Sequence, residues 1–275
     1  MEKYLIAFDL DGTLLTDDKK ITKLSNDYIQ KLRNDGHIVC IATGRPYAGM
    51  LNYYKELNLD TPIVNTNGGV THNPSNDKFE KVYLGMDKNI IKDIFINNKD
   101  SIVDAYFSFD DKVYYTSKHP RLEPFIHVDE TITEVVGPIE ETIDVDTGGV
   151  VLIVNEDTAE NFVNYIETKY SDTLATREFR RESGVRLYEL YQKAISKREG
   201  LKTILNHYGM TEKNLIAFGD GDNDLEMLDF AYVSVAMING REEAIQSAKF
   251  ITREDNNNDG AILFLDHFLG YNTLD

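Results

Sequence analysis

Short runs of purely apolar residues alternate with amphipathic helical patterns near the start of the chain. Residues 4–8 and 38–42 are such runs, and apolar residues recur at helical spacing between them, over 22–32. A run that is apolar at every position is typical of a strand covered on both faces, as in a parallel sheet. The repeated strand–helix–strand order therefore predicts an α/β fold, a Rossmann-like parallel sheet with helices on both faces.

Further segments of the same kind extend this sheet. The spacing predicts a helix over 201–208, which ends at a glycine. The remaining short runs rich in apolar residues predict strands at 62–64, 215–218, 232–236 and 250–252.

The middle of the chain, from 81 to 191, follows a different pattern. Its strands are predicted at 113–116, 150–154 and 185–190, and its helices at 87–99 and 157–169. This mixture indicates an α+β domain inserted into the sheet domain. We therefore expect a core formed by residues 1–83 and 191–275 and an inserted domain formed by residues 84–190.

The chain is strongly acidic, with 47 acidic and 29 basic side chains and a formal net charge of −18. This balance argues against binding to nucleic acid or to anionic membranes, because both need a basic surface. No apolar run approaches the about 18–20 residues of a membrane-spanning helix, and the first residues do not resemble a signal peptide. The single cysteine, Cys40, excludes an intrachain disulfide. We expect a soluble protein of the reducing cytoplasm.

Three of the predicted strands end in a small polar cluster. The first runs into Asp9-Leu10-Asp11-Gly12-Thr13, the second into Thr43-Gly44-Arg45, and a late strand into Gly219-Asp220-Gly221-Asp222-Asn223-Asp224. Parallel strands share one edge at their carboxyl ends, and ligands bind there, so we expect these clusters to line one crevice. Each cluster alone is also typical of a turn, but their joint position after separate strands indicates a site.

The predicted crevice holds at least the carboxylates of Asp9, Asp11 and Asp220. Carboxylates that lie this close repel one another and favour a bound cation. A ligand set made only of oxygen atoms points to Mg²⁺ rather than to zinc.

These motifs resemble the four motifs of the haloacid dehalogenase superfamily. The matching segments are residues 9–13, 42–46 (Ala-Thr-Gly-Arg-Pro), Lys197 and 219–224. The large insertion between the second and third motifs is similar to the C2-type cap of the Cof-like sugar-phosphatase branch. The segments 65–69 and 239–260 extend the resemblance.

The resemblance implies a Mg²⁺-dependent phosphatase that acts on small phosphorylated metabolites, such as sugar phosphates or phosphorylated cofactors. Asp9 would attack phosphorus and form an aspartyl-phosphate, while Asp11 would protonate the leaving oxygen and then activate water. Mg²⁺ would be held by Asp9, by the backbone carbonyl of Asp11 and by Asp220. Asp224 would support this metal site without touching the ion.

The resemblance also implies which groups hold the substrate phosphate. They are the backbone N–H of Leu10, Thr43 and Gly44 of the second motif, Lys197, and Asn223. Four cations lie close together near the third motif, at positions 193, 197, 198 and 202, and the family pattern fits best at Lys197.

Two other functions fit the same residues. A phosphomutase or phosphotransferase uses the same nucleophile but passes the phosphoryl group to a second hydroxyl instead of to water. A phospho-acceptor signalling domain has a similar crevice, but its acceptor aspartate lies on a middle strand and it carries no large insertion. The position of Asp9 on the first strand, beside Asp11, favours the hydrolase. The sequence indicates neither the physiological substrate nor the oligomeric state.

The segment 255–266 partly matches the spacing of a calcium-binding EF-hand loop. Its twelfth position holds Asp266 instead of the longer glutamate. The preceding residues 250–252 also read as a strand, where an EF-hand needs a helix. We therefore expect no calcium site in this segment.

Overall fold

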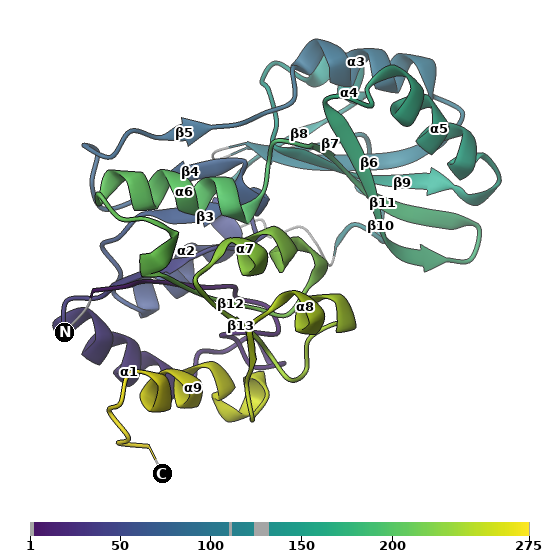
Figure 1. Cartoon of the computed structure of the whole chain (residues 1–275). Coiled ribbons are helices and arrows are strands. Elements are labelled where there is room, and N and C mark those ends of the chain that lie inside the picture. The colour runs from purple at the N-terminus through teal and green to yellow at the C-terminus, as the bar shows by residue number, and fades with distance from the viewer. Residues whose placement is uncertain (1–2, 110–111, 124–131, 275) are drawn as a thin grey trace. The chain divides into compact units, whose positions relative to one another are not determined.

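The computed structural model describes residues 3–109, 112–123 and 132–274. The chain forms two compact units, whose elements are labelled in Figure 1. The core unit combines the segments up to residue 45, from 50 to 82 and from 196 onward, and the inserted unit combines 46–49 and 83–195. The domain limits expected from the sequence, after residues 83 and 190, stay a prediction.

A five-stranded parallel sheet forms the centre of the core unit, in the order β14-β13-β12-β1-β2. Every residue of β1 and β12 is buried, as expected for strands covered on both faces. The predicted α/β fold with a Rossmann-like sheet is confirmed. The bounds of the strands are β1 (Leu5–Phe8), β2 (Ile38–Ile41), β12 (Leu215–Gly219), β13 (Val233–Ala236) and β14 (Phe250–Ile251).

Helices of the core unit cover both faces of this sheet (Figure 1). On one face Leu5 and Ala7 pack with Leu201 of α6, and on the other the ring of Phe218 meets the ring of Phe264 of α9 edge-on. The bounds of the helices are α1 (Lys23–Asn34), α2 (Tyr47–Glu56, which belongs to the core unit from residue 50 on), α6 (Lys197–His207), α7 (Leu225–Phe230), α8 (Glu242–Ser247) and α9 (Gly260–Phe268).

The strand predicted at 62–64 does not extend the parallel sheet as expected. It forms β3 (Ile63–Asn65), which pairs antiparallel with β4 (Val70–His72) in a three-stranded sheet completed by β5 (Val82–Tyr83). One parallel bridge, between Ala42 and Val64, links β3 to the end of β2. A tight turn after β3 reverses the chain directly into β4, which accounts for the antiparallel pairing of these two strands.

A six-stranded mixed sheet forms the inserted unit, in the order β10-β11-β9-β6-β7-β8. Neighbouring strands are antiparallel, except that β7 and β8 are parallel. Its helices pack on one face through residues that include Ile91, Ile139 and Phe162, which confirms the predicted α+β character. The bounds are β6 (Ile102–Phe109), β7 (Lys112–Tyr115), β8 (Thr133–Val136), β9 (Gly149–Asn155), β10 (Leu174–Glu182), β11 (Val185–Gln192), α3 (Lys88–Asn97), α4 (Ile139–Thr142) and α5 (Ala159–Lys169).

The segment 255–259 forms hydrogen bonds within itself and to the N-terminal end of α1. Asp255 accepts hydrogen bonds from the backbone N–H groups of Asn257 and Asn258, and Asp259 accepts them from the hydroxyls of Thr22 and Ser25. The strand β14 precedes this segment, where an EF-hand needs a helix. Within the described ranges, no helix combines the length and the apolar character that crossing a membrane requires.

Candidate active site

Three adjacent strands of the core sheet bring the polar clusters to one edge. The strands β12, β1 and β2 are neighbours, and their carboxyl ends lead to Asp220, Asp9 and Thr43 respectively. The backbone N–H of Asp9 donates to the carbonyl of Phe218 at 3.0 Å, so Asp9 continues the ladder between β1 and β12. The strand order therefore sets the first and fourth motifs side by side.

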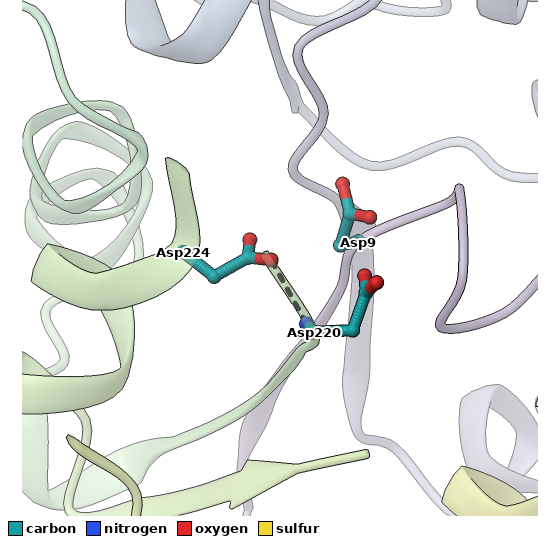
Figure 2. Close-up of side chains that lie close together, drawn as sticks. All are labelled: Asp9, Asp220 and Asp224. Atoms are coloured by element: carbon teal, nitrogen blue, oxygen red, sulfur yellow. Dashed lines mark hydrogen bonds between the residues drawn. The ribbon is translucent and has the colours of Figure 1, made fainter. Parts of the chain in front are cut away.

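Asp9, Asp220 and Asp224 form a carboxylate cluster at this edge (Figure 2). Each contributes one oxygen atom, and these atoms all lie within 4.8 Å of one another. Asp9 is 5% exposed and Asp224 is fully buried, so water screens little of their mutual repulsion. An oxygen-lined cluster of this kind fits a hard divalent cation.

The contacts of Asp224 distinguish it from the other two carboxylates. Its Oδ2 accepts hydrogen bonds from the backbone N–H groups of Asp220, at 3.0 Å, and Gly221, at 2.9 Å, and its Oδ1 lies 2.6 Å from Nζ of Lys197. Both oxygens are thus bound by protein donors. Asp9 and Asp220 are therefore better placed to hold a metal ion, with Asp224 fixing the backbone around them.

Lys197 is fully buried between two of the carboxylates. Its Nζ lies 2.5 Å from Oδ1 of Asp9 and 2.6 Å from Oδ1 of Asp224. Lys197 is the first residue of α6, and the side chain of Ser196 caps that helix by accepting from the N–H of Glu199. The helix thus begins before the predicted start at residue 201, which places the lysine at a fixed point of the first turn.

Burial and charge shift the proton affinities of this cluster. Burial raises the pKa of Asp9, the carboxylates of Asp224 and Asp220 raise it further, and Lys197 only partly opposes them. Burial, together with Asp224, raises the pKa of Asp220 to about 6. Burial opposes the charge on Lys197, but Asp224 and Asp9 keep its pKa above the usual lysine range. One ammonium does not balance three carboxylates, so the cluster fits an additional positive charge.

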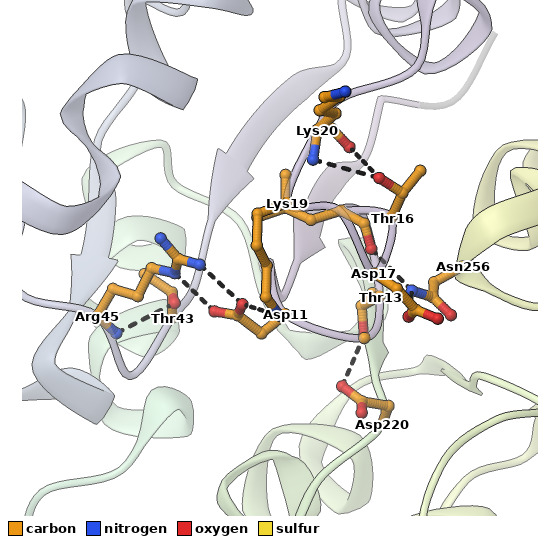
Figure 3. A network of polar contacts seen from close by, with 12 residues as sticks. Asp11, Thr13, Thr16, Asp17, Lys19, Lys20, Thr43, Arg45, Asp220 and Asn256 are labelled. Carbon is orange, nitrogen blue, oxygen red and sulfur yellow. Dashed lines mark hydrogen bonds and ion pairs between the residues drawn. The ribbon is translucent and has the colours of Figure 1, made fainter. Parts of the chain in front are cut away.

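Asp11 points away from this cluster, toward a pair of cations (Figure 3). Its carboxylate accepts from Nε of Arg45 at 2.6 Å and from Nη2 of Arg45 at 2.8 Å, and Nζ of Lys19 lies 2.8 Å from it. Burial opposes ionisation, but the hydrogen bonds from Arg45 and Lys19 lower the pKa of Asp11 to about 2. The sequence predicted one group of Asp9, Asp11 and Asp220; the structure groups Asp9 and Asp220 with Asp224 instead.

The residues expected to hold a phosphate lie around this edge. Thr43 is 1% exposed, and its hydroxyl accepts from the N–H of Arg45 at 3.2 Å, so the hydroxyl hydrogen can point to a ligand. Leu10 is fully buried, and its carbonyl accepts from the N–H of Leu15 at 2.8 Å in the turn that follows. Asn223 donates to Oδ1 of Asn67 at 2.9 Å.

Gly12 lets the first motif approach the fourth. Its φ is +79°, and a Cβ atom there would lie 2.3 Å from Oδ2 of Asp220, so only glycine fits. The hydroxyl of Thr13 donates to Oδ1 of Asp220 at 3.1 Å (Figure 3). The side chain of Asn239 donates to the carbonyl of Gly12 at 2.8 Å. The sequence assigned no role to Thr13 or Asn239, although both lie in segments of the family resemblance.

The edge of the parallel sheet thus carries a buried lysine and a carboxylate cluster that fits a metal ion. The model of one family, the haloacid dehalogenase-like hydrolases, matches residues 6–265. The chain belongs to this family. The resemblance inferred from the motifs, to the haloacid dehalogenase superfamily and its Cof-like branch, is confirmed, and the protein is a phosphoric monoester hydrolase.

One relative shares more than a third of its residues with this chain. The 5-amino-6-(5-phospho-D-ribitylamino)uracil phosphatase YitU of Bacillus subtilis is 35% identical over 266 residues, which is 96% of this chain and 97% of that protein.

Solved structures share the fold at lower identity. A Thermotoga maritima protein has a TM-score of 0.80 at 23% identity, and the match covers 96% of this chain and 97% of that one. A haloacid dehalogenase-like hydrolase from Bacteroides thetaiotaomicron has a TM-score of 0.78 at 23% identity, with 97% and 100% covered.

Proposed function

We propose that this protein is a Mg²⁺-dependent phosphatase for small phosphorylated metabolites, with Asp9 as its nucleophile. The observation that carries the proposal is the position of Asp9. Its carboxylate lies 2.5 Å from the buried Lys197 and within the carboxylate cluster, at the strand edge that also carries Thr43. A buried ammonium beside a carboxylate offsets the repulsion between that carboxylate and an incoming phosphate.

The donor set of the cluster fits Mg²⁺. The ion would be held by the side chains of Asp9 and Asp220 and by the backbone carbonyl of Asp11, while Asp224 orients the Asp220 backbone. When bound, Mg²⁺ supplies positive charge that neutralises the phosphate and the carboxylates around it.

The reaction then follows from groups of the chain. An oxygen of Asp9 attacks phosphorus, the bond between phosphorus and the leaving oxygen breaks, and protonated Asp11 gives that oxygen its proton. Water next attacks the aspartyl-phosphate and gives a proton to Asp11, which releases inorganic phosphate and restores the Asp9 carboxylate. Thr43, Gly44 and Asn223, with the Leu10 N–H, hold the remaining phosphate oxygens. Asp11 has to leave Arg45 and Lys19 before it can donate a proton, because both cations favour its ionised form.

The similarity to a phosphatase of a ribityl phosphate suggests the substrate class. We expect a phosphomonoester on a primary hydroxyl of a sugar or polyol chain, and we propose residues 84–190 as the cap domain of the family. The experiment is a panel of phosphate esters with Mg²⁺ or with EDTA, in which released phosphate is measured. 5-Amino-6-(5-phospho-D-ribitylamino)uracil, flavin mononucleotide and hexose phosphates form the central set.

We expect Mg²⁺-dependent release, fastest from the ribityl or sugar esters. Release that is equally fast in EDTA contradicts the metal proposal. A phosphoryl group that appears on an added alcohol, with no phosphate released to water, favours the phosphotransferase over the phosphatase.

Cation binding is expected to strengthen by about tenfold as the pH rises from about 6 to 8. The pKa of Asp220 is about 6 and that of Asp9 is raised, so at the lower pH the ion has to displace protons from these carboxylates. Titration calorimetry with Mg²⁺, in two buffers of different ionisation enthalpy, measures both the affinity and the protons released. Asp222→Asn is the control, because Asp222 pairs with Arg241 outside the cluster. An affinity that is equal at both pH values contradicts the prediction.

A further inference from the structure

The turn between β3 and β4 holds an unusual backbone conformation. Thr66, Asn67 and Gly68 follow one another with φ values of +52°, +54° and +102°. Glycine and asparagine tolerate this left-handed region, but a β-branched residue such as threonine rarely adopts it. Backbone of this kind persists only where its surroundings hold it, and it is concentrated at functional sites.

The surroundings that hold this turn are segments of the proposed active site. The N–H of Thr66 donates to the carbonyl of Arg45 at 3.0 Å, and the N–H of Asn67 donates to the carbonyl of Thr43 at 3.1 Å. A Cβ atom on Gly68 would lie 2.1 Å from the carbonyl oxygen of Ser196, the residue that caps the helix of the buried lysine. The turn is therefore fitted to both the second and the third motif.

The side chain of Asn67 reaches a further segment. Its Oδ1 accepts a hydrogen bond from Nδ2 of Asn223 at 2.9 Å. The same oxygen would lie 2.9 Å from a Cβ atom on Gly44, so the amide rests directly on that glycine. Asn67 thus joins the two segments that are proposed to bind phosphate, one after β2 and one after β12.

This contact constrains which way Asn223 points. An amide nitrogen carries two hydrogens. When Asn223 gives one of them to Asn67, its amide group is held in one orientation and the second hydrogen stays available for an anion. Without the Asn67 oxygen, we expect the Asn223 amide to rotate and to populate that orientation less.

We propose that Asn67 is a positioning residue for phosphate binding, which acts by orienting the Asn223 amide beside Gly44. This inference rests on the proposed phosphatase function. It assigns Asn67 to the binding of the phosphoryl group and gives it no part in bond breaking, so its loss raises KM and leaves kcat nearly unchanged.

The test begins with Asn67→Gly. Glycine allows the same left-handed backbone and keeps the hydrogen bond from the backbone N–H to the carbonyl of Thr43, and the substitution removes only the side-chain amide. We expect a KM for the best substrate, and an inhibition constant for inorganic phosphate, that are each raised about tenfold. We expect kcat, Mg²⁺ affinity and the melting temperature to stay near wild type. Asn58→Gly is the matched control: Asn58 also has a positive φ, +46°, but is exposed on the segment after α2.

A double-mutant cycle with Asn223→Ala decides whether Asn67 acts through Asn223. We expect the double variant to bind phosphate about as weakly as Asn223→Ala alone. Effects that multiply overturn the inference, as does an Asn67→Gly protein with wild-type KM and inhibition constant. Both of those outcomes leave the phosphatase function intact, because they require an active wild type. A wild type that neither hydrolyses any ester nor binds phosphate overturns the proposed function and this inference together.

Discussion

Asp9→Asn is expected to abolish phosphate release, by at least about 10⁴-fold, while the core sheet stays folded. The amide lacks the negative oxygen proposed to attack phosphorus, and the other described carboxylate that pairs with Lys197, Asp224, is fully buried and bound by backbone N–H groups. We expect the fold to survive because Lys197 keeps its contact with Asp224, and because one of three mutually repelling carboxylates is removed. We expect the melting temperature of the metal-free variant to match or exceed that of wild type.

The measurement is steady-state phosphate release at saturating substrate and Mg²⁺, together with thermal unfolding. Asp222→Asn serves again as the control, since it makes the same change on the loop after β12 and is expected to keep its activity. Full turnover by the Asp9→Asn protein would refute Asp9 as the nucleophile. An unfolded variant is distinguished by its circular dichroism, and Asp9→Ser then replaces it as a smaller polar substitution.

The positions of the motifs are predictable because the features behind them are local. A fully apolar run marks a buried strand, and the small polar residues that follow mark its end. For Asp9, Thr43 and Asp220 this is enough to predict one shared sheet edge, and the structure places them after adjacent strands. The arginine-rich strand β10, in contrast, was not predicted from the sequence. It lies at the edge of its sheet, and its charged residues interrupt the apolar pattern that marks a buried strand.

Side-chain direction is the part that the sequence leaves open. Asp11 lies two residues from Asp9, but its carboxylate pairs with Arg45 and Lys19 and does not join the carboxylate cluster. The cation that pairs with an aspartate can lie on a loop that is distant in the chain, so the spacing of residues in the sequence does not predict the pair. Asn67 is a similar case, since its partner Asn223 is 156 positions away.

The surroundings of Lys197 are likewise not predictable from the sequence. Sequence spacing alone leaves several basic residues near the third motif. The structure separates them, because Lys197 is fully buried while Lys202 is on the surface beside Glu199, and Lys193 donates to the carbonyl of Ser171. Burial of one lysine among carboxylates is a property of the folded chain, and it leads to a prediction with a large effect.

Lys197→Met is expected to lower kcat by about 10³-fold and to destabilise the metal-free protein by about 3–5 kcal/mol. Methionine fills a similar volume but carries no charge, so Asp9 and Asp224 are left buried without their shared cation. Removing one partner of a buried ion pair costs more than the pair contributes, because the remaining charge stays away from water. Chemical denaturation at pH 8 measures the stability, and phosphate release measures the rate.

The pH dependence separates this explanation from a simple packing defect. Burial already raises the pKa of Asp9 in the folded wild type, and without Lys197 that pKa rises further above its value in the unfolded chain. A group whose pKa is raised on folding stabilises the fold at low pH and loses that contribution as the pH rises through the raised pKa. The stability difference between wild type and variant should therefore shrink from pH 8 to pH 5, whereas a packing defect gives a constant difference.

Lys202→Met provides the matched comparison on the same helix. Lys202 pairs with Glu199 at 2.8 Å, and its side chain is 40% exposed, so water screens that pair. We expect its loss to change the stability by less than about 1 kcal/mol and to leave kcat unchanged. Equal effects of the two substitutions on kcat and on stability would mean that the contact of Lys197 with Asp9 contributes no more than an exposed ion pair. A large, pH-dependent loss at Lys197 alone supports a buried ammonium that balances the charges of Asp9 and Asp224.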